Sequence, residues 1–166
     1  DVITDEFVAD VTAATPLHDI GKIGIPDKVL LKPGKLTEQE YDVIKTHTLI
    51  GDETLDNVVN TFGDNTFLQV GKKIVRSHHE RPDGTGYPDG LKGDEIPIEA
   101  SVMAIADVYD ALRTKKVYKP AISHEKAIEI IKNGKGTQFL ADAVDAFLNV
   151  EKVFAYIWLE YETMCS

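Results

Sequence analysis

The segment over residues 98–114, IEASVMAIADVYDALRT, is apolar on nearly every side when it is wound into an α-helix. Such a helix is stable only when other elements cover most of its surface, so the segment predicts a buried helix. The chain shows no strong alternation of apolar and polar residues, which is the pattern of a half-buried strand. The sequence therefore predicts an all-α class.

Further helices are indicated by capping and stopping signals around apolar stripes of helical spacing. Thr37 and Glu40 form a capping box, and Pro16 is expected to bend or end the first helix. Ser123 caps a later helix, which Gly134 stops. The expected helices lie over residues 3–16, 37–60, 67–79, 98–114, 123–134 and 139–162.

The net charge of -10 argues against a broad electrostatic grip on DNA, because such binding needs a basic face. The single cysteine, Cys165, can close no internal disulfide, which fits a reducing compartment, and we expect a cytoplasmic protein without a membrane span in this segment. The chain opens without Met, partway into a helix, so we expect residues 1–166 to be one domain that lacks an upstream helix and any sensory or receiver domain. The aromatic tail of the last helix is expected to pack on the core or on a second subunit of a homodimer, through Phe154, Tyr156, Trp158 and Tyr161.

Asp107 is the most informative single residue, because it lies inside the apolar segment 98–114. An unpaired carboxylate in such a place costs several kcal/mol of desolvation, so a partner must compensate its charge. An arginine or a helix end would do so, and for the residue taken alone this ordinary explanation is the more frequent one. A metal ion is the alternative partner.

Four of the five histidines lie at helix ends or beside apolar stripes. Each has an ordinary explanation, either as a hydrogen-bonded core residue or as a cation near the carbonyls at a helix end. His124 follows a helix cap and precedes charged residues, so we expect it on the plain surface and outside any site. The remaining histidines, with the aspartate that follows the first of them, are His18, Asp19, His47, His78 and His79.

Together with Asp107, these residues form the kind of pattern from which all-α proteins build dinuclear metal sites, with ligands drawn from several helices. Imidazole and carboxylate ligands without thiolate suit iron, manganese, nickel or zinc, and disfavour a structural zinc site. Two such ions about 3.5 to 4 Å apart activate a bridging water and clamp an in-line phosphoryl displacement. The joint pattern therefore favours a metal-dependent hydrolase.

With these residues assembled, the chain resembles the HD-GYP family, a subgroup of the HD-domain metal-dependent phosphohydrolases. The resemblance rests on LHDIGKIGIPD, KPGKLT, HHERPDGTGYPDGLKGDEIP and IADVYDAL, and it covers nearly the whole chain. It implies an HD-domain helical bundle with a long Gly/Pro-rich loop beside a dinuclear metal site. It also implies a phosphodiesterase that hydrolyses cyclic di-GMP to the linear dinucleotide pGpG, in some members on to GMP, as an output domain in bacterial two-component signalling.

The resemblance also assigns roles to residues by their position in these motifs. Asp19 would bridge the two metal ions, and Lys22 would contact the scissile phosphate, so these two are the expected catalytic residues. The ions would be iron or manganese, with zinc or nickel as alternatives. Their implied ligands are His18, Asp19, His47, His78, His79 and Asp107.

The loop after His79 has three interpretations. Its turn sequences can serve only to reverse the chain, its glycines can let the backbone approach a nucleotide, or the loop can dock on diguanylate cyclase domains, as the resemblance suggests. Charged residues near the cleft can meet a phosphate or a guanine edge, or can be ordinary solvated charges. The substrate-binding residues expected here are Lys22, Arg81, Asp83, Gly86, Tyr87, Pro88, Lys116 and Lys119.

The chain also departs from the family pattern. Family members carry a further histidine ligand on a helix upstream of the His18–Asp19 doublet, and this chain has no counterpart for it. Lys116 and Lys119 replace arginines, and lysine lacks the bidentate geometry with which arginine recognises phosphate. Two alternatives to a cyclic di-GMP phosphodiesterase therefore stand: a catalytically weak signalling or docking module, and an HD phosphohydrolase that acts on another nucleotide.

Overall fold

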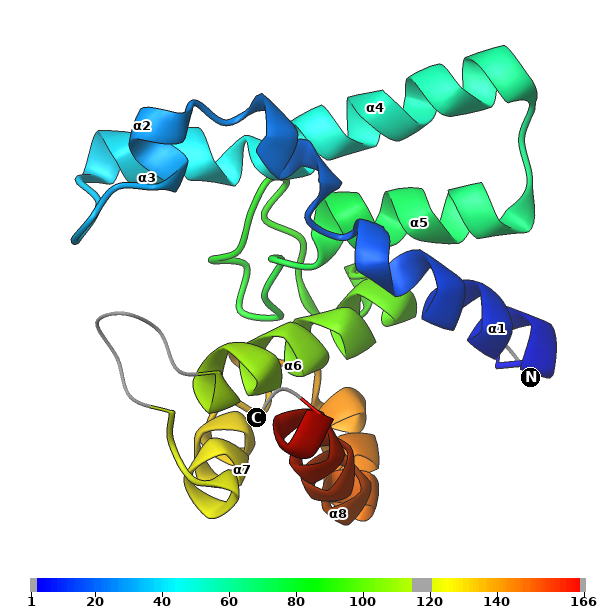
Figure 1. Cartoon of the computed structure of the whole chain (residues 1–166). Helices are drawn as coiled ribbons and strands as arrows, with labels where there is room; N and C mark the ends of the chain where they lie inside the picture. The colour runs from blue at the N-terminus through cyan, green and yellow to red at the C-terminus, as the bar shows by residue number, and fades with distance from the viewer. Residues whose placement is uncertain (1–2, 115–120, 165–166) are drawn as a thin grey trace.

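The computed structural model describes residues 3–114 and 121–164, and every regular element within them is helical (Figure 1). The predicted all-α class is confirmed, because no β-strand occurs in these two ranges. Short 3-10 turns lie at Thr15–Leu17, Ile20–Gly24 and Gly93–Glu95. The α-helices are α1 (Asp5–Ala14), α2 (Asp27–Leu30), α3 (Glu38–Lys45), α4 (His47–Phe62), α5 (Thr66–Ser77), α6 (Ile98–Arg113), α7 (His124–Asn133) and α8 (Ala141–Met164).

Helix α6 lies between two groups of helices (Figure 1). On one side it contacts α5, which is itself covered by α1 and α4, and on the other side it contacts α7 and α8. Ala100 and Ile105 are accordingly 0% and 3% exposed. The predicted burial does not extend all round, since Val102 is 50% exposed.

Each group has its own apolar core. The first group has two buried clusters: one joins α1, α5 and Met103 of α6 around Ile74, and the other joins α4 and α5 around Val75. The core of the second group joins α6, α7 and α8 around Ile131 and Phe147. The candidate site lies at the end of α5, where Asp107 of α6 lines the same cleft as His78 and His79.

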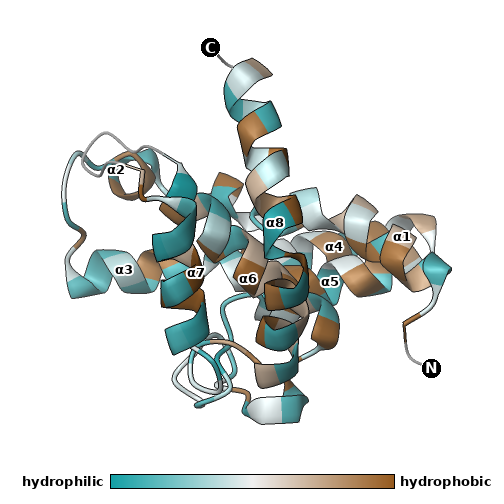
Figure 2. Ribbon diagram, turned by 90° about the horizontal axis from the view of Figure 1, so that it is seen from below, coloured by the Kyte–Doolittle hydropathy of each residue, from teal (hydrophilic) through white to brown (hydrophobic). Residues whose placement is uncertain are grey.

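The aromatic residues in the tail of α8 differ in burial. Phe154 packs edge-to-face on Phe147 and Tyr109, and Trp158 is only 9% exposed. Tyr156, in contrast, is 62% exposed, and the C-terminal half of α8 extends beyond the other helices (Figure 2). The expected packing on the core therefore holds for part of the tail.

The capping box and the helix breaks largely follow the sequence signals. The Thr37 hydroxyl accepts a hydrogen bond from the Glu40 amide, and the Glu40 carboxylate accepts one from the Thr37 amide at 2.7 Å. Helix α1 ends at Ala14, just before Pro16, as predicted. Ser123 and Gly134 cap the two ends of α7 as predicted.

The prediction of one helix over residues 37–60 is wrong, because the helix breaks at Thr46. The Thr46 hydroxyl donates to the carbonyl of Val43 at 2.7 Å, and such side-chain bonds compete with the helical pattern. Helix α3 ends at Lys45 with no buried residue, and α4 begins at His47, whose side chain is fully buried. The break thus turns His47 into the interior.

A close contact between backbones fixes the 3-10 turn Ile20–Gly24 against α4. A Cβ atom added to Gly21 would lie 1.9 Å from the carbonyl oxygen of His47 and 2.5 Å from the amide nitrogen of Gly51. Only glycine allows an approach of this kind. The contact sets the residue just before the turn, Asp19, beside the start of α4.

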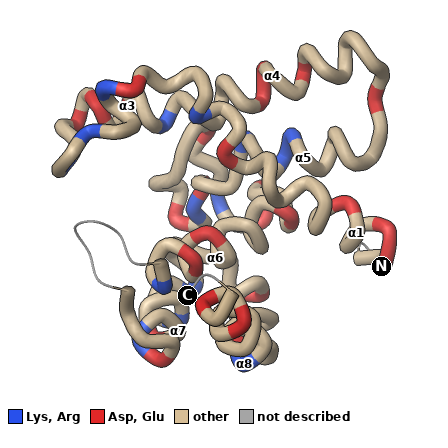
Figure 3. Tube along the Cα trace, in the orientation of Figure 1, with Lys and Arg blue, Asp and Glu red and all other residues tan. Residues whose placement is uncertain are grey.

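Over the described residues, neither the charges nor the apolar residues are gathered in one part of the chain in a way that indicates a basic face or a membrane span (Figure 3). Lys and Arg are intermixed with Asp and Glu along most of the trace, but the charged residues of α4 are all acidic (Figure 3). None of the helices in the described part of the chain is both long and apolar enough to cross a lipid bilayer.

Candidate metal and catalytic site

Four side chains from separate parts of the chain meet between α4, α5 and the turn that follows α1. Asp19 lies before the 3-10 turn Ile20–Gly24, His47 opens α4, and His78 and His79 follow the last turn of α5. One ligand atom from each of the four lies within 4.8 Å of the others. The adjacent pair His78–His79 converges because α5 ends there, so their rings lie 4.0 Å apart, centroid to centroid.

Main-chain carbonyls orient two of these imidazoles. The Nδ1 atom of His47 lies 2.7 Å from the carbonyl oxygen of Ile44, and Nδ1 of His78 lies 3.0 Å from that of Ile74. A carbonyl oxygen only accepts hydrogen bonds, so Nδ1 carries the proton and Nε2 of the neutral ring presents a lone pair. The two Nε2 atoms face each other at 3.4 Å. This is the tautomer and orientation that metal-binding histidines adopt.

Asp19 adds a negative oxygen to the same point. Its Oδ1 atom is buried without a hydrogen-bond partner, 3.4 Å from Nε2 of His47 and 4.0 Å from Nε2 of His78. Burial would raise the pKa of Asp19, but hydrogen bonds from His18 and Lys22 outweigh it and hold the pKa below its usual range. A charged, unpartnered oxygen beside two imidazole lone pairs is repulsive unless a cation lies between them. The donor set therefore fits a divalent metal ion.

Burial favours the neutral form of three of these histidines, His47, His78 and His79. Desolvation lowers the pKa of His47, lowers that of His78 to about 4, and lowers that of His79 further still. A metal ion binds the neutral form of imidazole. At neutral pH these three rings can therefore bind a metal ion without first losing a proton.

His18 and Asp107 lie at the edge of this group and outside the 4.8 Å cluster. His18 donates from Nδ1 to the carbonyl of Thr15 at 2.9 Å, and its Nε2 lies 3.2 Å from Oδ2 of Asp19. Asp107 is partly buried on α6, and desolvation raises its pKa. No lysine or arginine of the described ranges forms an ion pair with Asp107, so the ordinary explanation by a basic partner finds no support there.

Lys22 lies directly beside the cluster. Its Nζ atom donates to Oδ2 of Asp19 at 2.5 Å, and its side chain is 39% exposed. The ammonium group therefore reaches both the carboxylate and the solvent from which a phosphate would arrive. Lys116 and Lys119 lie outside the described residues.

The loop after His79 is held by a residue that the sequence did not single out, Glu80. Its carboxylate is 3% exposed and accepts hydrogen bonds from the amides of Asp89, Gly90 and Leu91 at 2.6, 3.1 and 3.0 Å. Arg76 of α5 adds a two-pronged ion pair to Asp89 at 2.8 Å. An acidic residue directly between buried histidines and a glycine-rich loop is the sequence signal that could have indicated this role.

Gly86, Tyr87 and Pro88 form the part of the loop nearest the histidines. A Cβ atom at Gly86 would lie 2.5 Å from Cα of Glu80, so the chain can return this closely only at a glycine. The ring of Tyr87 packs on that of His79 at 4.9 Å between centroids. The loop therefore reverses the chain and covers one side of the histidine cluster.

Arg81 and Asp83 pair with each other. A guanidinium nitrogen of Arg81 lies 3.1 Å from Oδ2 of Asp83, while Oδ1 of Asp83 accepts from the amide and the hydroxyl of Thr85 at 3.0 and 2.6 Å. Both carboxylate oxygens of Asp83 thus have partners within the loop. Arg81 remains 36% exposed and lines the cleft.

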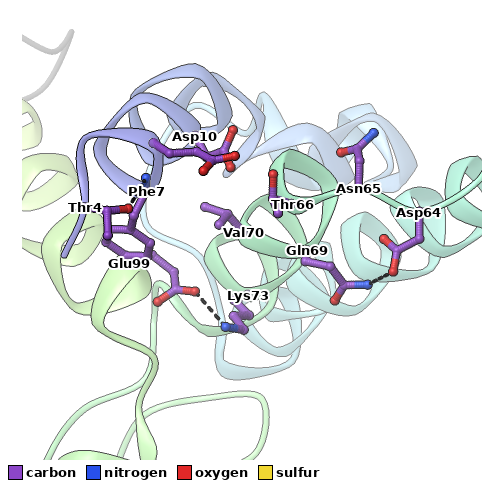
Figure 4. A pocket seen from close by; sticks show the side chains of 11 residues that line it. Thr4, Phe7, Asp10, Asp64, Asn65, Thr66, Gln69, Val70, Lys73 and Glu99 are labelled. Atoms are coloured by element: carbon purple, nitrogen blue, oxygen red, sulfur yellow. Dashed lines mark hydrogen bonds and ion pairs between the residues drawn. The ribbon is translucent and has the colours of Figure 1, made fainter. Parts of the chain in front are cut away.

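Two cavities differ in their fitness for an anionic substrate. A groove of about 540 Å³ between α1, α5 and the start of α6 is rimmed by Glu6, Asp10, Asp64 and Glu99, with Lys73 paired to Glu99 at 3.0 Å (Figure 4). These carboxylates repel phosphate. The smaller cleft, about 150 Å³, is lined by His78, His79, Arg81 and Asp107, and it is the candidate active site.

His124 is not a plain surface residue, so that prediction is wrong. Its side chain is 17% exposed, Nδ1 lies 2.9 Å from the hydroxyl of Tyr109, and Nε2 lies 2.5 Å from the carboxylate of Glu151. Because the cap at Ser123 starts α7 against α8, the ring points inward and joins α6, α7 and α8. It takes no part in the histidine cluster.

A family model described as HD domain matches residues 2–142, and the chain therefore belongs to the HD domain family. HD domains bind divalent metal ions, for which the Asp19 and histidine cluster is the candidate site. Within that family the chain is an HD-GYP domain, as its relatives confirm.

The chain is 49% identical over 156 residues to a cyclic di-GMP phosphodiesterase of Vibrio cholerae, covering 94% of this chain and 32% of the relative. It is 49% identical over 146 residues to the cyclic di-GMP phosphodiesterase response regulator RpfG of Xanthomonas campestris, covering 88% and 37%. It is also 43% identical over 135 residues to 3'3'-cGAMP-specific phosphodiesterase 2 of Vibrio cholerae, covering 81% and 25%. The chain thus spans about a third or less of the length of these relatives.

Proposed function

We propose that this domain is a metal-dependent phosphodiesterase that hydrolyses cyclic di-GMP to pGpG, with GMP as a further product. The observation that carries the proposal is the arrangement around Asp19, in which a charged, unpartnered oxygen faces the Nε2 lone pairs of His47 and His78. The names of relatives that are 49% identical to the chain support the choice of substrate.

The proposed cofactor is a pair of divalent ions, iron or manganese, with zinc and nickel as alternatives. Such ions, when bound, supply Lewis acidity toward a phosphoryl oxygen and lower the pKa of a water molecule to near neutrality. The proposed ligands are His47, His78 and His79 on one side, His18 and Asp107 on the other, and Asp19 between them. The tight grouping of four of these ligands supports the first side, and the raised pKa of the partly buried Asp107 carboxyl supports the second.

The chain's own residues would position and stabilise the substrate. Lys22 can leave the Asp19 carboxylate and neutralise charge on the non-bridging oxygens of the scissile phosphate, because a side chain that is 39% exposed has room to turn. Tyr87 covers the face of His79 and excludes water from that side of the cluster. Arg81 lies where a second phosphate would emerge from the cleft, with Lys116 and Lys119 as further candidates for that contact.

The test is turnover by the metal-loaded protein. Domain prepared anaerobically with iron or manganese is incubated with cyclic di-GMP, and the products are separated by chromatography. We expect pGpG from the wild type and a loss of at least a hundredfold in the D19N variant, with no loss in D27N, which changes an exposed acid on α2. A wild type that holds its metal ions and forms no product would refute the proposal.

A second substrate is favoured by one specific observation, the likeness to a relative named as specific for 3'3'-cGAMP. Initial rates with cyclic di-GMP, 3'3'-cGAMP and cyclic di-AMP, at equal concentrations, distinguish the substrates. A docking module without turnover is the other alternative, and Asp107 favours it because this ligand lies outside the tight cluster. Stoichiometric binding of cyclic di-GMP without hydrolysis by the loaded protein would establish it.

Two partners belong to the same proposal. The rigidly held loop over residues 80–97 supports docking of a diguanylate cyclase domain, which a binding assay with the purified cyclase domain would test. Helix α8 supports a homodimer, because it exposes Val150, Val153 and Ile157 at the 3- and 4-residue spacing of a coiled-coil seam, with Met164 one heptad after Ile157. Analytical ultracentrifugation of the wild type and of I157E would test it, with a monomer in both cases as the contrary result.

A further inference from the structure

The cleft beside the histidines is too small to hold a whole cyclic dinucleotide. Its volume is about 150 Å³, whereas pockets that enclose a drug-sized ligand measure roughly 300–1,000 Å³. Only one part of the substrate can enter it. Because His78, His79 and Asp107 form some of its wall, that part must lie next to the reacting phosphate.

Several polar side chains in the wall are already engaged with other groups of the protein. Glu80 accepts three backbone amides, Arg81 pairs with Asp83, and Nδ1 of His78 lies 3.0 Å from the carbonyl oxygen of Ile74. Gln138 differs from them. Its side-chain amide makes no hydrogen bond to any residue of the described ranges, yet it lines the cleft. A carboxamide left without partners in a cleft is available to a ligand.

The backbone that carries Gln138 is firmly held. The carbonyl of Gly134 accepts hydrogen bonds from the amides of Gln138 and Phe139 at 2.8 and 3.0 Å, and the Phe139 ring is 2% exposed. The amide of Asp83 donates to the carbonyl of Thr137 at 3.2 Å, which ties this turn to the loop that follows the histidines. The backbone at Gln138 is therefore held in place beside the cleft that its side chain lines.

We propose that Gln138 binds the base edge of a purine of the substrate and is a specificity-determining residue of this site, an inference that rests on the proposed function. A carboxamide offers one acceptor and two N–H donors side by side. Guanine presents the acceptor O6 next to the N1–H donor, and adenine presents the N6 amino donor next to the N1 acceptor. Gln138 matches the guanine edge, and matches the adenine edge after its amide rotates by half a turn.

An amide can pair with either base because it can rotate, whereas a carboxylate cannot, so replacing Gln138 by glutamate tests the proposal. Gln138→Glu leaves two acceptors, which match the N1–H and N2 amino donors of guanine but face the N1 lone pair of adenine. Gln138→Leu removes every hydrogen bond at similar volume. Gln69→Leu is the matched control, since Gln69 is an exposed glutamine in the acidic groove of Figure 4, away from the cleft.

The experiment measures kcat and KM for cyclic di-GMP with the metal-loaded wild type and the three variants, and the inhibition constant of cyclic di-AMP as a competitor. A bidentate contact to a base corresponds to roughly a 5- to 150-fold effect. We expect Q138L to raise KM for cyclic di-GMP about tenfold or more with kcat nearly unchanged, and Q69L to match the wild type. In Q138E the ratio of the cyclic di-AMP inhibition constant to KM should rise at least about tenfold.

Two results would overturn the inference while the proposed function stands: wild-type KM in Q138L, or a loss in Q138E that is equal for the two ligands. The second would show a structural role for the side chain. If the loaded wild type hydrolyses no cyclic dinucleotide, the proposed function fails on its own. Equilibrium binding of cyclic di-GMP then decides the inference, with equal affinity of wild type and Q138L as the contrary result.

Discussion

Glu80→Gln is the substitution whose effect follows most directly from the structure. The Glu80 carboxylate accepts from three amides, two on Oε1 and one on Oε2, at 2.6 to 3.1 Å. A glutamine keeps the shape, but its NH₂ group must face at least one N–H donor. One bond to a charged acceptor is lost and the other two are weakened, and each such bond contributes about 1.5–3 kcal/mol.

We therefore expect E80Q to destabilise the loop over residues 80–97 by about 2–4 kcal/mol. Because the loop can open without global unfolding, urea denaturation alone can underreport this cost. Native-state hydrogen exchange at the amides of Asp89, Gly90 and Leu91 measures it directly. The protection of these amides should fall by at least about thirtyfold.

The matched control lies in the same loop. Glu95 accepts from the amide of Lys92 at 2.8 Å but is exposed, so water can replace a lost bond in E95Q. Its cost should stay below about 1 kcal/mol. Exchange rates in E80Q that equal those of the wild type would refute the account of Glu80 as the anchor of the loop.

Three further predictions concern the frame of the site. G21A should cost at least about 3 kcal/mol of unfolding free energy in urea titrations, because its Cβ meets the carbonyl of His47 at 1.9 Å, whereas G71A, with contacts no closer than 3.6 Å, should be neutral or slightly stabilising; equal effects would contradict the contact. R76Q should lower the free energy of unfolding by about 0.5–1 kcal/mol at pH 7, and this difference from the wild type should shrink at acid pH. Arg76 holds the pKa of Asp89 below its usual value. The pair therefore stabilises the fold fully above the ordinary aspartate pKa, and this stabilisation is lost as the pH falls through the lowered pKa of Asp89. A stability difference between R76Q and wild type that does not change with pH would be the contrary result. Removal of metal by chelation should lower the stability by about 3–4 kcal/mol relative to protein kept at 100 to 1,000 times the dissociation constant, as measured by the melting temperature, and a melting temperature insensitive to metal would argue against the site.

The sequence predicted those features that depend on local signals. The capping box at Thr37, the stop at Gly134 and the central helix α6 all arise from residues close in the chain, and all are present. The break at Thr46 escaped prediction because the apolar pattern continues through it. It depends instead on the Thr46 hydroxyl, which donates to the carbonyl of Val43, and on the burial of His47.

Features that depend on partners far along the chain were missed for a physical reason. Glu80 has its role through amides 9 to 11 residues away, and His124 through Tyr109 and Glu151 on two other helices. No periodicity encodes such contacts. The gathering of Asp19 with His47, His78 and His79 was anticipated because several separate chemical anomalies pointed to one explanation and because the family resemblance implied the same ligands. Their role as ligands stays a prediction.

The orientation of His47 and His78 by carbonyl oxygens of Ile44 and Ile74 has a consequence for how such a domain can diversify. Main-chain atoms are the same whatever side chain a position carries. Neighbouring residues in the cleft can therefore be exchanged to admit a different nucleotide while the imidazoles keep their aim. Substrate choice and metal coordination are separable traits in this architecture, and each can change without retuning the other.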